Sequence, residues 1–436
     1  MIRLSSADPD FAAGFDSLVS SRAEAGLDVS APVAEILAAV RADGDEALFR
    51  LTARFDRVFL TPDTVRLSAA EIDRACATID PALLEALDLA AHRIERFHRL
   101  QMPSDLATAD EAGLSLGMRW TPLDAVGLYV PGGKAAYPSS VLMNALPARV
   151  AGVSRIAMCV PTPDGQLDPL VLAAARRAGV HEIYRVGGAQ AVGALAFGTR
   201  SIPPVDRIVG PGNAYVAEAK RQVFGHVGID SIAGPSEVVV LADGINDPDH
   251  VALDLLAQAE HDEMAQSILV TNDPAFADAV TGAVARVLPT LPRAAIADAS
   301  WRDHGAVIVV PDWSAAWPLV NRLAPEHLQL MLADPEPAFA AIRHAGAIFI
   351  GRDCPEAIGD YVAGPNHVLP TSRTARFASG LSVFDFLKRT TWVRTAPGAI
   401  ARVGPAAVAL ATAEGLQAHA RSVAARLGPG RNPVTP

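Results

Sequence analysis

Residues 126–209 carry four short apolar runs: Val126-Gly-Leu-Tyr-Val130, Arg155-Ile-Ala-Met-Cys-Val160, Glu182-Ile-Tyr-Arg-Val186 and Arg207-Ile-Val209. Stretches with helical spacing separate them, and this alternation is typical of a parallel sheet whose strands are joined by crossover helices. A second set of runs follows at residues 237–241, 267–271, 306–310 and 347–350. The sequence therefore predicts an α/β protein with two Rossmann-like parallel-sheet domains.

The segments outside these runs are expected to support the two sheets. Residues 31–40 and 81–91 carry apolar side chains at three- and four-residue spacing, which predicts helices. Residues 406–427 predict one amphipathic helix in a C-terminal tail that has too little mass for a core of its own. We therefore expect this tail to pack on another surface, such as a partner subunit.

The predicted elements divide the chain into four parts. They are an N-terminal helical extension (1–26), a discontinuous first α/β domain (27–128 and 237–381), a second, nucleotide-binding α/β domain (129–236) and a small C-terminal tail domain (382–436).

The composition is typical of a folded multidomain enzyme, with 436 residues, 50% hydrophobic and 19% charged. The formal net charge of −11 disfavours nucleic acid as a partner, because nucleic-acid binding normally requires a basic face. The N-terminus has no cationic segment followed by an apolar run, and no stretch resembles a membrane span. We expect a cytoplasmic protein that binds neither nucleic acid nor membranes.

The cysteines disfavour a disulfide framework and a thiolate metal site. Cys76, Cys159 and Cys354 lie far apart without CxxC spacing, so we interpret them as packing residues. Any metal would then have nitrogen and oxygen ligands.

Glycine clusters follow three of the predicted strands, in Val130-Pro-Gly-Gly-Lys134, Val186-Gly-Gly-Ala-Gln190 and Val209-Gly-Pro-Gly-Asn213. A glycine turn before a helix exposes backbone N–H groups that suit a phosphate, so three such turns suggest a nucleotide. The nearest approach to the dinucleotide fingerprint is Gly210-Pro-Gly-Asn-Ala-Tyr215, with Asp230 twenty residues after Gly210. Tyr215 replaces the third glycine, and ordinary strand-to-helix turns are the alternative interpretation.

Two short motifs combine residue types that bind metals or transfer protons. In Gln258-Ala-Glu-His261, positions i and i+3 of a helix could present an amide oxygen and an imidazole to one ion, although a solvated helix face is an alternative. In Leu323-Ala-Pro-Glu-His327, a carboxylate beside an imidazole could supply a general acid/base and its partner, although an ordinary loop pair is an alternative. The run after His327 could be a strand or a helix.

Two further segments carry candidate site residues. The turn-rich stretch from Ile358 to His367 combines a carboxylate, two glycines and a histidine. On the predicted tail helix, Glu414 and His419 would lie roughly 140° apart.

Five segments, in order between residues 127 and 419, resemble the histidinol dehydrogenase family. They are Val130-Pro-Gly-Gly-Lys-Ala-Ala-Tyr-Pro-Ser-Ser-Val-Leu-Met-Asn144, Asp230-Ser-Ile-Ala-Gly-Pro-Ser-Glu237, Gln258-Ala-Glu-His-Asp262, Ala324-Pro-Glu-His-Leu328 and Tyr361-Val-Ala-Gly-Pro-Asn-His-Val-Leu-Pro-Thr371. Together they imply an enzyme that oxidises L-histidinol to L-histidine with zinc and two NAD molecules, the last step of histidine biosynthesis.

The resemblance also implies roles for individual residues and a homodimer with shared active sites. Glu326 and His327 would be catalytic, with His327 as the base for the alcohol and Glu326 activating water. The zinc ligands would be Gln258, His261, Asp360 and, from the other subunit, His419. These six residues and Ser236, His367 and Glu414 would contact the substrate, and Tyr129, Gln190 and Asn213 would contact NAD.

The sequence departs from the family pattern in two places. Lys134 stands where a threonine is more usual, and Ser372-Arg373 follow Thr371 where a pair of glycines is common. A related zinc- and NAD-dependent dehydrogenase of another small alcohol, such as a sulfonated diol, is the nearest alternative. A non-catalytic scaffold and a zinc hydrolase are less favoured, because the catalytic set is intact and there is no HExxH motif.

Overall fold

The computed structural model describes residues 1–20, 28–132, 137–232 and 234–427. They form two units: residues 1–101 with 123–386, and residues 102–122 with 387–436. Among the described residues, no helix has the length and apolar character needed to cross a membrane.

The first unit contains two parallel sheets, which confirms the predicted fold class. The six-stranded sheet has the order β1-β11-β10-β9-β12-β13 and the five-stranded sheet the order β6-β5-β4-β7-β8. The strands of the first are β1 (Ile2–Ser5), β9 (Glu237–Ala242), β10 (Gln266–Thr271), β11 (Ala306–Val309), β12 (His327–Met331) and β13 (Ala347–Ile350). Those of the second are β4 (Ala125–Tyr129), β5 (Arg155–Cys159), β6 (Glu182–Tyr184), β7 (Arg207–Val209) and β8 (Gly228–Ile229).

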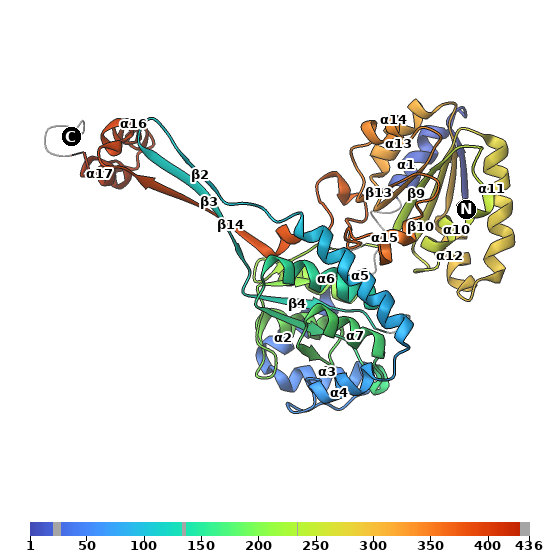
Figure 1. Ribbon diagram of the computed structural model, residues 1–436, viewed down its shortest axis with the longest axis horizontal. Coiled ribbons are helices and arrows are strands. Elements are labelled where there is room, and N and C mark those ends of the chain that lie inside the picture. The colour runs from blue at the N-terminus through green and yellow to red at the C-terminus, as the bar shows by residue number, and fades with distance from the viewer. Residues whose placement is uncertain (21–27, 133–136, 233, 428–436) are drawn as a thin grey trace. The chain divides into compact units, whose positions relative to one another are not determined.

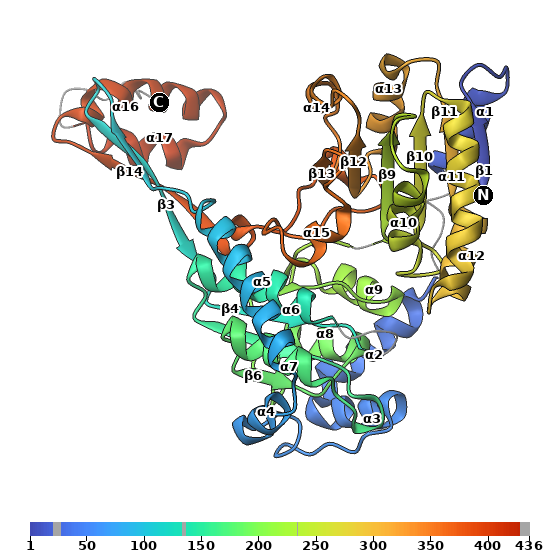
Figure 2. The same ribbon diagram turned by 45° about the vertical axis from the view of Figure 1, so that its right-hand side comes forward.

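Helices cover both faces of the six-stranded sheet, where β9, β10 and β12 lie side by side (Figure 2). One face packs against α10 (Pro248–Ala259), α11 (Pro274–Val287) and α12 (Ala294–His304). The other packs against α1 (Phe11–Ser20), α13 (Trp313–Leu323) and α14 (Glu336–Ala341) (Figure 1). Because both faces are covered, β9 and β10 are buried along their whole length, which explains their continuous apolar runs.

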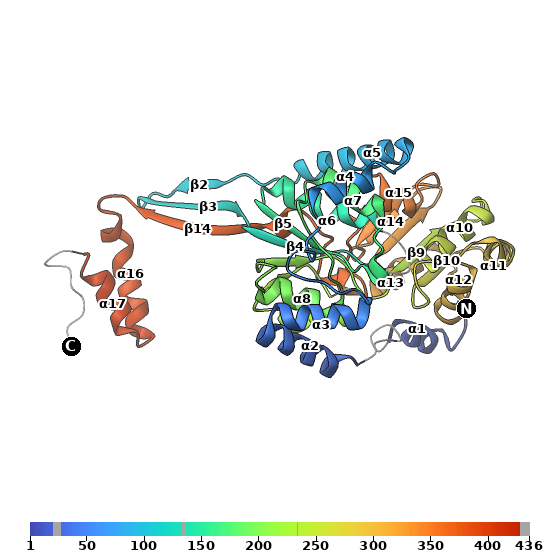
Figure 3. The same ribbon diagram turned by 90° about the horizontal axis from the view of Figure 1, so that it is seen from below.

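The five-stranded sheet is also covered on both faces (Figure 3). Its core cluster on one side includes residues of α2 (Ser30–Asp43), α3 (Asp45–Asp56), α8 (Gly188–Phe197) and α9 (Ala214–Val223). On the other side lie α4 (Ala69–Cys76), α5 (Pro81–Arg99), α6 (Pro138–Ala151) and α7 (Pro169–Ala178). Buried Cys76 and Cys159 occupy packing positions, as expected, and Cys354 is only partly buried.

Several helices begin where an aspartate precedes a proline. Asp80, Asp168, Asp247 and Asp273 each accept a hydrogen bond from a backbone N–H of the first turn, and a proline follows each at the start of the helix. Such a cap is worth about 1 kcal/mol, and proline there removes a donor that has no helical partner. The local sequence thus sets where these helices start.

The observed packing differs from the predicted domain boundaries. Residues 30–129 contribute α2, α3 and β4 to the core of the five-stranded sheet, not to the sheet of residues 237–381. The opening segment is not purely helical, because β1 pairs with β11 and extends the six-stranded sheet. Residues 21–26 of the predicted extension lie outside the described residues. Amphipathic spacing identifies a helix but does not specify which sheet it covers.

The second unit is built on an antiparallel ribbon with the order β14-β3-β2. β2 (Leu106–Ala109), β3 (Leu114–Pro122) and β14 (Leu387–Thr395) lead to α16 (Ala399–Ala413) and α17 (Gln417–Ala424) (Figure 1). The tail therefore includes residues 102–122, which the predicted boundaries assigned elsewhere. The prediction of one helix over 406–427 was wrong, because Gly415 adopts a φ of +76° and separates α16 from α17.

Candidate functional site

The residues predicted to be catalytic lie at the amino end of β12, beside the amino end of its neighbour β9. His327 is the first residue of β12, which pairs with β9, and Glu326 precedes it. The backbone N–H of Glu237, the first residue of β9, donates to Oε2 of Glu326 at 3.0 Å. The backbone carbonyl oxygen of Glu237 lies 3.3 Å from Nδ1 of His327. The backbone of β9 therefore positions both side chains, and the ambiguous run after His327 is a strand.

The surroundings of His327 indicate a neutral imidazole whose Nε2 carries no hydrogen. A carbonyl oxygen can only accept, so the contact with Glu237 requires the hydrogen on Nδ1. Nε2 is buried without a hydrogen-bond partner among the described residues. Burial lowers the pKa of His327 to about 4, against the opposing effect of the Asp360 carboxylate. The imidazole is therefore neutral near pH 7, and its Nε2 lone pair is available to a proton.

The carboxylate of Asp360 lies close to three imidazoles. Asp360 belongs to α15 (Glu356–Tyr361). Its Oδ1 is 3.8 Å from Nε2 of His327 and 3.9 Å from Nδ1 of His367, and its Oδ2 is 4.0 Å from Nε2 of His261. The structure thus brings together four residues that were singled out separately in the sequence.

Gln258 and His261 lie at the C-terminal end of α10. Gln258 is in the last turn, and its Oε1 is buried without a hydrogen-bond partner among the described residues. His261 follows the end of the helix, where its N–H donates to the carbonyl of Gln258 at 3.2 Å, and its side chain is 39% exposed. The sequence suggested that both residues lie on one helix face, but only Gln258 belongs to α10 and His261 lies just beyond its end.

These donors fit a zinc ion. Two atoms that each lie about 2.1 Å from one ion are at most about 4.2 Å apart, and Nε2 of His261 and Oδ2 of Asp360 meet this limit at 4.0 Å. The Gln258 oxygen lacks a partner that an ion would supply. An imidazole, a carboxylate and an amide oxygen form a nitrogen and oxygen set that zinc accepts.

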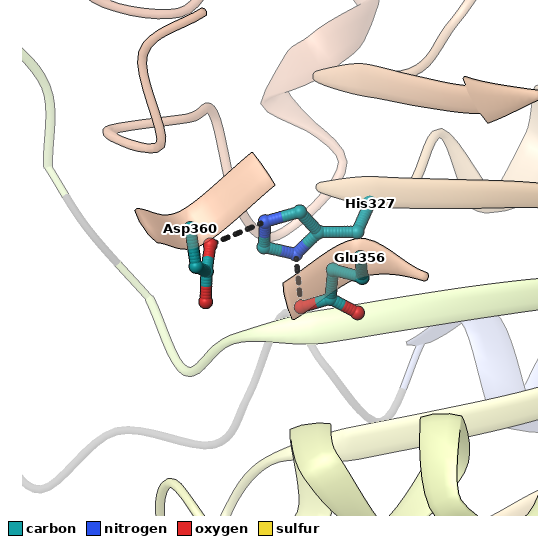
Figure 4. A group of neighbouring side chains, drawn as sticks. All are labelled: His327, Glu356 and Asp360. Carbon is teal, nitrogen blue, oxygen red and sulfur yellow. Dashed lines mark ion pairs between the residues drawn. The ribbon is translucent and has the colours of Figure 1, made fainter. Parts of the chain in front are cut away.

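A second group of potential metal donors consists of His327, Glu356 and Asp360, whose ligand atoms lie within 4.8 Å of one another. Figure 4 shows the two carboxylates on opposite sides of the imidazole ring. Glu356 approaches Nδ1 at 3.4 Å, whereas Asp360 approaches Nε2. Because the ring stands between the two carboxylates, this geometry suits an oriented base better than three ligands of one ion.

Glu356 is a site residue that the sequence interpretation missed. Burial, followed by the nearby carboxylates of Asp360 and Glu326, raises the pKa of Glu356 well above its usual value. Its place four residues before Asp360 was an available signal, because positions i and i+4 of a helix share a face.

The imidazole of His367 contacts residues of two helices, α15 and α6. Its Nδ1 lies 3.0 Å from the carbonyl oxygen of Asp360, and its Nε2 lies 3.5 Å from Oγ of Ser140 on α6. Burial lowers the pKa of His367. Ser236 directly precedes β9, and its carbonyl accepts from the N–H of Gln266.

The predicted nucleotide residues follow three strands of the five-stranded sheet at its carboxyl edge. Tyr129 ends β4, and its buried hydroxyl accepts from the N–H of Gly188 at 3.1 Å, while burial raises its pKa to about 12. Gln190 lies in α8, which follows β6, and its Oε1 is buried without a hydrogen-bond partner among the described residues. Asn213 follows β7 and caps α9. A nucleotide normally binds at this edge of such a sheet.

A family model described as histidinol dehydrogenase matches residues 20–427. The chain belongs to the histidinol dehydrogenase family. It is similar to the histidinol dehydrogenase of Gluconobacter oxydans, with 67% identity over 98% of this chain and 99% of the relative. The relative from Rhodospirillum rubrum is 63% identical over 98% and 99% of the two chains.

A solved structure, the crystal structure of histidinol dehydrogenase from Elizabethkingia anophelis, has the same fold. The TM-score is 0.93 at 35% identity, with 98% of each chain covered. Membership of the histidinol dehydrogenase family makes the protein an oxidoreductase, and the family name implies a role in histidine biosynthesis.

Glu414 and His419 are predicted site residues of the tail, and Lys134 is a departure from the family pattern. Glu414 and His419 belong to the second unit, where both side chains are exposed. They flank the break between the helices rather than lying on one helix, because Glu414 caps the end of α16 and His419 is in α17. Lys134 lies outside the described residues.

Proposed function

We propose that the protein oxidises L-histidinol to L-histidine through histidinaldehyde, using one zinc ion per subunit and two molecules of NAD. The observation that carries this proposal is the cluster around Asp360, whose carboxylate lies 3.8–4.0 Å from the imidazoles of His327, His367 and His261. The cluster places potential metal ligands beside a neutral buried base, as a metal-dependent alcohol oxidation requires.

Gln258, His261 and Asp360 are the proposed zinc ligands of the first unit. Bound zinc would hold the imidazole and amino nitrogens of histidinol and orient its alcohol. Ser236 and His367 are proposed to contact the same substrate. The hydrogen bond from His367 to the Asp360 carbonyl supports this role, because it fixes the ring beside the ligand carboxylate.

His327 is the proposed base for the alcohol. Its Nε2 has no hydrogen-bond partner among the described residues, so it can take the hydroxyl proton as hydride leaves for NAD. Glu326 is proposed to activate the water that hydrates the aldehyde before the second hydride transfer. Its Oε2 accepts from the N–H of Glu237, which holds the carboxylate in place.

NAD is proposed to bind at the carboxyl edge of the five-stranded sheet, in contact with Tyr129, Gln190 and Asn213. The strand order reverses between β4 and β7, and ligands of open α/β sheets bind at such a switch point. Tyr129 is the last residue of β4, and Asn213 follows β7.

The test is the amount of NADH formed per histidinol consumed by metal-replete protein. About two NADH per substrate, lost after chelation and restored by zinc, is expected from two hydride transfers. No NADH with histidinol would contradict the proposed substrate, and undiminished turnover after verified metal removal would contradict the zinc role.

We further propose a homodimer in which Glu414 and His419 of the partner subunit complete each site. The argument is the small core of the second unit, whose buried residues are Val408, Ala420, Ala424 and Leu427, with most of β14 exposed. So little buried surface favours packing on another chain.

Mixing two inactive variants tests this arrangement. A dimer of His327→Asn and His419→Asn chains would contain one site with both substitutions and one intact site if His419 crosses between subunits. Coexpression should therefore restore turnover that neither variant has alone. If the mixed dimer stays inactive while the wild-type control is active, each subunit supplies its own His419.

A further inference from the structure

A buried ion pair fixes both backbone polar groups of one glycine in the proposed nucleotide loop. Lys220 of α9 and Asp230, which follows β8, form an ion pair with side chains 2% and 4% exposed. Nζ of Lys220 donates to the carbonyl oxygen of Gly210 at 2.9 Å. Oδ2 of Asp230 accepts from the N–H of Gly210 at 2.7 Å, and its Oδ1 accepts from the N–H of Ser231.

Gly210 begins the loop that connects β7 to α9, and the loop ends at Asn213. The φ of Gly210 is +109°, and a Cβ there would lie 2.1 Å from the carbonyl oxygen of Tyr129. The loop is therefore pressed against the end of β4 in a conformation that only glycine adopts without strain. Lys220 and Asp230 hold it there through the carbonyl and the N–H of Gly210.

The engagement of Asp230 also excludes one role that its position suggested. An acidic residue about twenty positions after the first fingerprint glycine usually binds the ribose hydroxyls of a dinucleotide. Here both carboxylate oxygens bind backbone N–H groups, and the side chain is buried beside Lys220. Asp230 thus acts within the protein rather than on the ribose.

Stability alone does not account for this arrangement. Removing two charges from water is costly, and a buried ion pair can often be replaced by neutral side chains without loss of stability. What a neutral pair would not reproduce is the simultaneous anchoring of the N–H and the carbonyl of Gly210. That anchoring fixes the start of the loop whose last residue is Asn213.

We propose that Lys220 and Asp230 are positioning residues for NAD, which set the conformation of the Gly210–Asn213 loop without touching the cofactor. This inference rests on the proposed NAD site. It predicts that loss of the pair weakens NAD binding selectively, because the substrate and metal residues lie on other elements, chiefly α10, β12 and α15.

Lys220→Met tests the proposal together with the double variant Lys220→Met/Asp230→Asn. The single variant leaves a buried carboxylate uncompensated and should lower the melting temperature. The double variant removes that charge and should recover most of the loss. In both, the Kd for NADH and the KM for NAD should rise about tenfold to a hundredfold, because the Gly210 carbonyl is no longer held. The KM for histidinol should stay within about twofold.

Two further variants separate loop position from charge. Gly210→Ala keeps the ion pair but forces the loop away from Tyr129, so it should weaken NADH binding in the same way. Arg221→Ala removes an exposed arginine that pairs with Glu218 on the same helix, and it should leave NADH affinity unchanged. These proteins keep the full chain and are compared after matched metal loading.

The outcomes are decisive in both directions. If the double variant binds NADH as tightly as the wild type does, the positioning role is wrong. The same conclusion follows if the double variant regains both NADH affinity and melting temperature relative to Lys220→Met. A parallel loss of NADH affinity, histidinol binding and melting temperature in every variant would show a purely structural role and also overturn it. Failure of the wild-type protein to bind NADH would instead overturn the proposed function on which this inference rests.

Discussion

Nδ1 of His327 lies 3.3 Å from the carbonyl oxygen of Glu237, so the backbone of β9 determines which nitrogen of the imidazole proposed as the base carries the hydrogen. The carbonyl holds the hydrogen on Nδ1 and leaves the lone pair on Nε2, which faces Asp360 at 3.8 Å. The backbone N–H of Glu237 also donates to the carboxylate of Glu326. One strand end thus positions both proposed proton-transfer groups.

His327→Asn is expected to lower kcat about 10²- to 10⁴-fold, since an amide cannot replace the base. The bound metal per subunit and the Kd for NADH should stay close to wild type, because the proposed ligands and the nucleotide loop are not changed. Steady-state NADH formation and metal analysis check both statements. Retention of full turnover in both oxidation steps would show that another group takes the proton.

Glu356→Gln is expected to stabilise the metal-free protein more at pH 8 than at pH 5. The folded protein raises the pKa of Glu356 above its usual value of 4.5. A raised pKa means that the stabilising contribution is complete below about pH 4.5 and is lost as the pH rises through the folded value. Glutamine removes this loss, because its amide does not ionise in this pH range. Each unit of pKa shift in the wild type corresponds to about 1.4 kcal/mol.

The measurement is the difference in melting temperature between variant and wild type across this pH range, after treatment with a chelator. Exposed Glu336, replaced by glutamine, is the matched control and should give a difference that does not change with pH. A difference for Glu356→Gln that is constant, or larger at pH 5, would mean that this carboxyl is not kept protonated by the fold.

Ser372→Gly is expected to stabilise the protein by up to about 1 kcal/mol, whereas Arg373→Gly is not. Ser372 and Arg373 have φ values of +52° and +65°, the left-handed region in which side chains are strained. Glycine relieves this strain at both positions. Arg373, however, donates from Nε to the carbonyl of Arg322 at 3.0 Å, and glycine would lose that bond.

Denaturant unfolding of the two variants distinguishes strain from side-chain anchoring. Equal stabilisation by both substitutions would show that the Arg373 hydrogen bond contributes nothing. The observed φ values show that the loop has left-handed backbone at two consecutive residues, a conformation that glycine adopts without strain.

The sheets were predictable because their strands are buried on both faces. The runs at residues 126–130, 155–160, 237–241 and 267–271 all became strands, since two covered faces require continuous apolar sequence. The ribbon of the second unit gave no such signal, because β2 is exposed along its whole length and β14 nearly so. Its pairing joins residues 114–122 to 387–395, a long-range contact that local spacing does not encode.

The site was predictable where a residue type carries chemistry by itself, as for His327 and Asp360. It was less predictable where function depends on what a side chain meets in the fold. Asp230 has the spacing of a ribose-binding acid but binds Lys220 and a backbone N–H instead. Glu356 was missed, because a glutamate is usually a surface residue and only burial beside His327 distinguishes this one.

Gly117→Val is expected to reduce turnover through the tail. Gly117 of β3 pairs with Trp392 of β14, and a Cβ at Gly117 would lie 2.1 Å from atoms of the indole ring. Valine would displace the ring and weaken the ribbon that leads to α16 and α17. Glu414 caps the end of α16, and His419 lies in α17. If these residues complete the proposed site, kcat should fall while the Kd for NADH stays unchanged, because the nucleotide residues belong to the first unit.

Leu106→Ala is the matched control, because Leu106 is an exposed residue of β2 in the same ribbon. It should leave both turnover and NADH affinity close to wild type. Stopped-flow NADH formation and fluorescence titration provide the two readouts, with circular dichroism to establish that the variants are folded. Suppose that folded Gly117→Val protein keeps wild-type turnover although a shift in tryptophan fluorescence shows that the Trp392 ring is displaced. The geometry of the ribbon would then not matter for the site, which would argue against a ligand supplied by the tail.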